Sequence, residues 1–179
     1  MEVVGFEIPS ESPVFLALLA IHVPIGLLAV VAGAAAMLAE KRRGWHTKAG
    51  SIYFWSIAVL FGTSTALAAM RWADDYHLFA LGALAFVAAV IGRGVRRHRW
   101  KKQIDLHIVG MGLSYISMLT AFYVDNGKSL PILRDLPRLA YWLVPSGVGI
   151  PLIVRALLRY REPLAVRKAT ALRSFSPRA

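Results

Sequence analysis

Residues 13–39, PVFLALLAIHVPIGLLAVVAGAAAMLA, contain no lysine, arginine, aspartate or glutamate. An α-helix rises 1.5 Å per residue, so about 20 apolar residues cross a hydrocarbon layer about 30 Å thick. The stretch therefore predicts a transmembrane helix that begins at Pro13. It is too long, and the segment before it too acidic, for a cleaved signal peptide. We expect the helix to remain in the mature protein.

Four further runs lack these charges, at 49–70, 76–92, 106–124 and 139–154. The chain is 57% hydrophobic and only 17% charged, which lies outside the range of ordinary soluble domains. These features predict an all-α integral membrane bundle of five transmembrane helices. The fifth run is short and contains Pro145 and Pro151, so we expect it to be kinked. A transport protein would use such a segment as a broken helix that lines a small polar site.

Lysine and arginine predict the orientation, because cytoplasmic loops retain positive charge during insertion. Basic blocks follow the first, third and fifth runs, all on one side of a five-span arrangement. The prediction is an N-terminus outside and a C-terminus in the cytoplasm of a bacterial inner membrane. It divides the chain into an extracytoplasmic segment (1–12), a five-helix transmembrane domain (13–160) and a basic cytoplasmic tail (161–179).

The net charge of +11 does not indicate nucleic-acid binding, because the basic residues are dispersed between apolar runs. The expected partner is the lipid bilayer, with other membrane proteins or further copies of the chain as additional partners. Cysteine is absent, which excludes disulfides and thiolate metal sites. Phosphate-binding loops, metalloprotease helices and serine elbows are also missing, so no enzyme is expected.

Histidine is the ionisable residue type found within the predicted spans, and intramembrane ionisable groups are candidates for function. His46 and His107 begin the second and fourth spans at the same membrane boundary, so their rings are expected to meet. Facing imidazoles of this kind bind haem iron in helical bundles. His22 lies about 13 Å inside the first span, while His77 begins the third span at the opposite boundary. Their depths differ by about 10 Å, which argues against a second haem.

The neighbours of these histidines fit a flat ligand without requiring one. Gly50 and Tyr53 follow His46 at helical spacing, and Met111 and Ser114 follow His107 in the same way. Methionine can also ligate iron, so Met111 joins His46, His107 and His22 as a candidate haem contact. The alternative is that the histidines form hydrogen bonds between helices and that Met111 only packs. Asp74 and Asp75 near His77 are interpreted as ordinary loop residues, with no metal site.

Three segments resemble the bacterial membrane proteins grouped as domain of unknown function 2306. They are His46-Thr47-Lys48-Ala49-Gly50-Ser51-Ile52-Tyr53, His107-Ile108-Val109-Gly110-Met111-Gly112-Leu113-Ser114-Tyr115 and Thr120-Ala121-Phe122-Tyr123-Val124-Asp125-Asn126-Gly127. The resemblance implies a small multi-span protein with a histidine at the start of spans two and four, and no established reaction. The His-x3-Gly and His-x3-Met spacings are also similar to parts of two-haem b-type cytochromes.

Two functional hypotheses follow from the sequence. The first is a structural or accessory subunit of a membrane complex. The alternative is an electron-transfer protein that binds b-type haem through His46 and His107, with His22 tuning or completing the site.

Overall fold

The computed structural model describes residues 2–3, 6–7, 12–40, 44–95, 103–130 and 134–174, with side chains for 12–40, 44–95, 103–130 and 134–160. The basic residues at 41–43 and 96–102, which contributed to the predicted orientation, lie outside the described residues. The chain forms α1 (Pro13–Leu38), α2 (Trp45–Met70), α3 (Trp72–Gly94), α4 (Gln103–Asn126) and α5 (Arg138–Ser174), with a short antiparallel ribbon, β1 (Glu2–Val3) and β2 (Phe6–Glu7), and a 3-10 turn, η1 (Gly127–Ser129).

All five α-helices contain a segment long and apolar enough to cross a membrane, as the sequence predicted. Their outward faces carry large apolar side chains, among them Val31, Leu38 and Trp55, which are 66%, 88% and 64% exposed. Such a surface would be unfavourable in water but is ordinary in contact with lipid tails. The exposed face therefore fits a protein whose surroundings are hydrocarbon.

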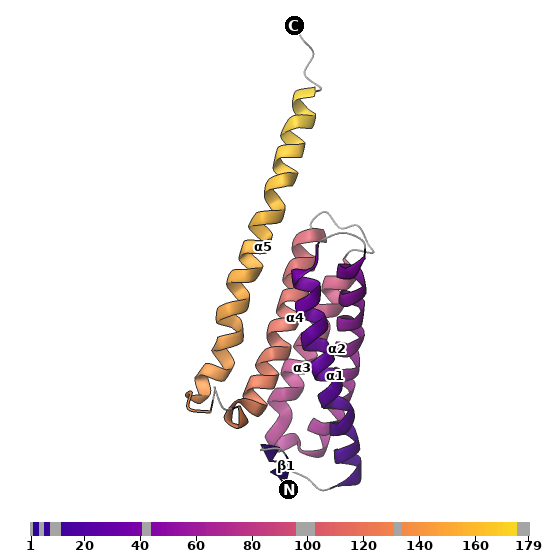
Figure 1. Ribbon diagram of the computed structural model, residues 1–179, viewed down its shortest axis with the longest axis vertical. Coiled ribbons are helices and arrows are strands. Elements are labelled where there is room, and N and C mark those ends of the chain that lie inside the picture. The colour runs from indigo at the N-terminus through magenta and orange to yellow at the C-terminus, as the bar shows by residue number, and fades with distance from the viewer. Residues whose placement is uncertain are drawn as a thin grey trace.

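Consecutive helices run antiparallel and pack side by side, and α1 also contacts α4, which closes a bundle of four helices (Figure 1). We call the end where α2 and α4 begin the His46 end, and the opposite end, where α1 begins, the Pro13 end. The ribbon of β1 and β2 lies at the Pro13 end (Figure 1). α5 lies outside the bundle against α4 and extends past it at the His46 end (Figure 1).

Small residues allow the helices of the bundle to approach closely. A Cβ atom built at Gly110 on α4 would lie 2.8 Å from Gly92 Cα and 2.9 Å from the Ala88 carbonyl oxygen on α3. A Cβ atom at Gly33 on α1 would collide with the Tyr115 ring and approach Tyr53 to 3.0 Å. Close approach through glycine and alanine is the usual basis of helix association in membranes. Gly33 on α1 is therefore a packing position.

α5 is one continuous α-helix through Pro145 and Pro151, so the broken-helix interpretation is wrong. The helix shows no sharp bend in Figure 1. One of its glycines instead receives a side chain from α4: Gly149 faces Ile116, and Ile153 of α5 in turn packs against Gly112 of α4. Membrane helices tolerate proline because neighbouring helices and small local adjustments satisfy the freed backbone groups. The helix also continues beyond the predicted fifth span, to Ser174.

The close contact of α3 and α4 predicts opposite effects for two Gly→Ala substitutions. Gly110→Ala should lower the free energy of unfolding by about 1–3 kcal/mol, because the new methyl group meets backbone atoms that cannot move aside. Gly62→Ala is the control, because a Cβ atom there meets nothing within 4 Å and alanine favours the helix. Thermal unfolding in detergent measures both. Equal stability of the two variants would contradict the close packing.

Candidate functional site

His46 and His107 lie beside each other at the His46 end of the bundle. Their ring centroids are 6.2 Å apart, and the ring planes are nearly perpendicular at 82°. His46 is in the first turn of α2, and His107 is one turn into α4. The prediction that these two rings meet is confirmed. We call them the His46–His107 pair.

Each imidazole of the pair is held by the backbone of a neighbouring helix. His46 Nδ1 lies 2.9 Å from the carbonyl oxygen of Ala36 on α1, and His107 Nδ1 lies 2.7 Å from that of Gly92 on α3. A carbonyl oxygen can only accept, so both Nδ1 atoms must carry a proton and donate it. In the neutral form of each ring, Nε2 then has the lone pair. An Nδ1–H to carbonyl bond is a common way of fixing the tautomer and orientation of a metal-binding histidine.

A buried polar layer lies two helical turns inside the pair. Tyr53 and Ser114 each follow one of the histidines by seven residues, and their hydroxyl groups are 2.8 Å apart. Tyr53 is 2% exposed and Ser114 is fully buried. Tyr115 donates a hydrogen bond to the Val30 carbonyl oxygen, 3.0 Å away on α1. The layer therefore joins three helices and limits the site on its inner side.

Small residues line the bundle between the pair and this polar layer. The two layers are about 10 Å apart along the helices, by the rise per residue. Ala49 and Gly50 occupy the interval on α2, and Gly110 occupies it on α4. A Cβ atom at Gly50, one turn from His46, would meet no atom within 4 Å. Gly50 therefore adjoins open space, whereas Gly110 is packed against Gly92 and Ala88 of α3.

His22 lies far from the pair. Its Nδ1 is 2.7 Å from Thr63 Oγ1 on α2, and the Thr63 hydroxyl also lies 3.1 Å from the carbonyl oxygens of Val59 and Leu60. If Thr63 donates to these carbonyls, His22 donates to Thr63. Thr63 is 17 residues beyond His46, or about 25 Å along α2. The structure therefore places His22 in an α1–α2 contact and does not bring it to the His46–His107 pair.

Met111 lies one turn from His107 but packs toward α3. Its Cγ atom would be 3.2 Å from a Cβ atom built at Gly92, and Met111 borders the apolar core of the bundle. His77 is at the opposite end, where its ring lies 6.1 Å from that of Trp142 on α5. Met111 therefore packs against α3, and His77 lies at the other end of the bundle from the pair.

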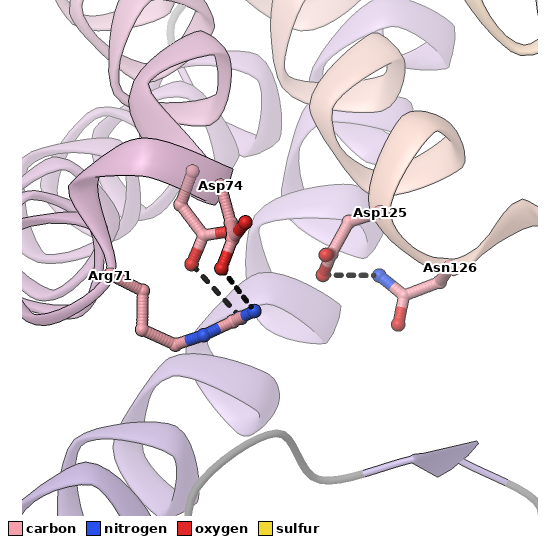
Figure 2. A network of polar contacts seen from close by, with 5 residues as sticks. Arg71, Asp74, Asp125 and Asn126 are labelled. Atoms are coloured by element: carbon pink, nitrogen blue, oxygen red, sulfur yellow. Dashed lines mark hydrogen bonds and ion pairs between the residues drawn. The ribbon is translucent and has the colours of Figure 1, made fainter.

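The Pro13 end carries a network of charged and polar side chains (Figure 2). Arg71, which joins α2 to α3, forms ion pairs with Asp74 at 3.1 Å and Asp75 at 3.2 Å. Both aspartates belong to the first turn of α3, so the interpretation as loop residues is wrong. Their negative charges also favour a helix N-terminus. Asp125 on α4 accepts a hydrogen bond from Asn126 at 3.1 Å (Figure 2). The ion pairs hold Arg71 against the first turn of α3, and the Asp125–Asn126 bond lies within the end of α4.

No group of three or more histidine, aspartate or glutamate residues that could hold a metal ion occurs among the described residues. Zinc sites need three or four protein ligands, whereas haem brings the equatorial nitrogens of its own macrocycle and needs only axial ligands. A pair of histidines is an incomplete site for a bare metal ion but a complete axial set for haem.

Two features of the site were not predicted. The sequence placed Tyr53 and Ser114 on the histidine face of their own helices but did not predict that their hydroxyl groups meet. Each residue follows its histidine by seven positions, and this equal spacing could have predicted the contact. The carbonyl partners at Ala36 and Gly92 had no signal in the sequence, because any helix residue has a carbonyl group.

Comparison with known proteins found no match to a family model, a curated protein or a solved structure. The resemblance to domain of unknown function 2306 stays a prediction.

The bond between His22 and Thr63 predicts a measurable contribution to stability. Thr63→Val should lower the free energy of unfolding by about 1 kcal/mol, because hydrogen bonds between membrane helices are worth about 0.6 to 2 kcal/mol. Thr65→Val is the matched control, since the described contact of that hydroxyl is with Phe61 of its own helix. Thermal unfolding in detergent distinguishes them. The bond contributes nothing if both variants unfold at the same temperature.

Proposed function

We propose that the chain is a membrane protein that binds b-type haem, with His46 and His107 as the two axial ligands. The supporting observation is the pair itself, in which two imidazoles from facing helices are adjacent and each is held by an Nδ1 hydrogen bond to a carbonyl oxygen. In this arrangement the lone pair of each neutral ring is on Nε2, which would be the nitrogen that binds the metal. We assign no ligand role to His22 or Met111.

The dimensions of the pair fit this proposal. A metal–imidazole bond is about 2 Å long, and a ring nitrogen is about 1 Å from the ring centroid, so two imidazoles on opposite sides of one metal have centroids about 6 Å apart. The observed separation is 6.2 Å. Gly50 lies one helical turn from His46, and a Cβ atom there would meet nothing within 4 Å, so a flat ligand beside this part of α2 would meet no side chain at that position.

When bound, haem would supply one-electron redox chemistry. The residues of the chain would hold and shield it. The Ala36 and Gly92 carbonyls fix the imidazoles in orientation and raise their basicity, as outer partners of metal-binding histidines do. The apolar bundle excludes water from the inner side of the site. The chain is then best described as an electron-transfer protein.

We further propose that the His46 end faces the cytoplasm. The described cations near this end include Lys48, Arg93 and Arg155, and further lysines and arginines occur in the connecting sequences. At the Pro13 end, by contrast, Arg71 is paired with two aspartates. This distribution agrees with the bias of cytoplasmic segments toward positive charge.

The orientation predicts the behaviour of a reporter fused after Ala179. An alkaline phosphatase fusion should be inactive there and a fluorescent protein fusion should be bright, because the C-terminus would lie in the cytoplasm. The same reporters inserted after Lys128 should give the reverse result and serve as the control. High phosphatase activity after Ala179 would overturn the proposed orientation.

The alternative, a structural or accessory subunit, is supported by the large apolar outer faces of α1 and α5. These faces are available to a second membrane protein as well as to lipid. A protein that contains no haem when it is isolated from haem-replete cells would favour this role.

The haem proposal predicts that each histidine of the pair is needed for a normal spectrum. His46→Ala and His107→Ala should lose most of the Soret absorption of protein purified in mild detergent, because each removes one axial ligand. His77→Ala should keep it, since that ring packs against Trp142 at the other end of the bundle. Circular dichroism and elution volume report whether each variant is folded.

Added imidazole provides a second test in the same experiment. In folded His107→Ala it should restore haem binding by taking the place of the missing ring. A Soret band unchanged in both variants of the pair would remove these residues from the ligand set.

A further inference from the structure

Arg93 directs its charge along the bundle toward the hydrocarbon. The ring pairs Phe54–Phe86 and Phe61–Phe79 set the register of α2 and α3, so that the backbone of Arg93 is level with the first turn of α2. Its guanidinium, however, lies 4.6 Å from the centre of the Phe54 ring and 3.3 Å from Ser51 Oγ. Ser51 is six residues, or about 9 Å, along α2 from Trp45.

This direction is the reverse of the usual one for a basic residue near a helix end. Long basic side chains ordinarily extend outward so that the charge reaches water or lipid headgroups. A guanidinium group has five N–H donors. Its hydrogen bond goes to the Ser51 hydroxyl, and no described carboxylate forms an ion pair with it. The charge is therefore poised to meet an anion at this membrane boundary.

An apolar groove begins at the same serine. It runs along the outer side of the α1–α2 contact and is lined by Ile25 and Leu28 of α1 and by Ser51, Ile52, Trp55 and Val59 of α2. We call it the α1–α2 groove. From Ser51 to Val59 it spans about 12 Å of helix. Trp55 is 64% exposed, so the groove opens to the surroundings of the protein.

Lys48 lies on the same face of α2 as the α1–α2 groove, on the side of the groove nearer to the His46 end. It precedes Ser51 by three residues, Ile52 by four and Trp55 by seven, the spacings that place helical residues in one row. Lys48 is exposed in the second turn of the helix. Two cations, Arg93 and Lys48, and the Ser51 hydroxyl thus lie at one end of the α1–α2 groove. This is the end of the groove nearest the membrane boundary.

We propose that Arg93, Lys48 and the α1–α2 groove form a binding site for one anionic phospholipid. The basic side chains and the Ser51 hydroxyl hold the phosphate, and one acyl chain lies in the groove. Charge complementarity supports this occupant, because a phosphodiester accepts several hydrogen bonds from guanidinium and ammonium groups. The site is separate from the His46–His107 pair and does not depend on haem.

Native mass spectrometry of the full chain in detergent tests the site. The protein is titrated with dioleoyl phosphatidylglycerol and, separately, with dioleoyl phosphatidylcholine, which has the same acyl chains and no net charge. One phosphatidylglycerol per chain should bind in preference to phosphatidylcholine. Arg93→Gln with Lys48→Gln should weaken its binding at least about tenfold, since each substitution removes a charge-assisted hydrogen bond to the phosphate.

Arg155→Gln with Arg159→Gln is the matched control, because it removes two exposed cations of α5 and makes the same change in net charge. It should bind phosphatidylglycerol as the wild type does. Leu28→Trp, which fills the groove, should weaken the binding of both lipids. Thermal unfolding in lipid-free detergent verifies that the variants are folded.

Three results would overturn the proposal. The first is wild-type affinity for phosphatidylglycerol in the variant lacking Arg93 and Lys48. The second is an equal loss in the α5 control, which would mean that the lipid binds beside α5 or is attracted by net charge alone. The third is displacement of bound phosphatidylglycerol by an equimolar amount of oleate, which would assign the groove to a free fatty acid.

Discussion

The contact of Gly92 with Gly110 positions His107, one member of the His46–His107 pair. Because neither residue has a side chain, the backbones of α3 and α4 approach until a Cβ atom at either glycine would touch the opposite backbone. The same Gly92 supplies the carbonyl oxygen that accepts the proton of His107 Nδ1. Gly92 therefore contributes both to the close packing of α3 with α4 and to the orientation of the His107 imidazole. A larger residue there would separate the helices and remove the acceptor from its place.

Hydrocarbon surroundings impose a second constraint, because polar groups within them must find partners inside the protein. Some of the described hydroxyl groups satisfy this constraint by a hydrogen bond to a carbonyl of their own helix, as Thr65 and Thr120 do. Others form a hydrogen bond between helices, as Tyr53 and Ser114 do. No buried side-chain nitrogen or oxygen among the described residues lacks a partner. Arg93 is different from these residues, because its charge is directed to the lipid-facing side of α2.

The sequence predicted the helices and the meeting of the histidines because both follow from local rules. Charge-free runs mark the spans, and a fixed rise per residue sets the depth of His46 and His107. It did not predict the carbonyl partners or the direction of Arg93, which depend on the register between helices distant in sequence. The sequence was also misleading for α5, because Pro145, Gly149 and Pro151 suggest a broken helix. In the structure the helix is continuous, and Ile116 of α4 fills the space beside Gly149.

The most direct test of the proposed ligation is the electron paramagnetic resonance spectrum of the oxidised protein, purified in mild detergent from haem-replete cells. Two strong imidazole ligands make ferric haem low-spin, so a low-spin ferric signal equivalent to one haem per chain is the predicted result. A predominantly high-spin signal would mean that one histidine of the pair is not bound to iron. The absence of a ferric haem signal would contradict haem binding altogether.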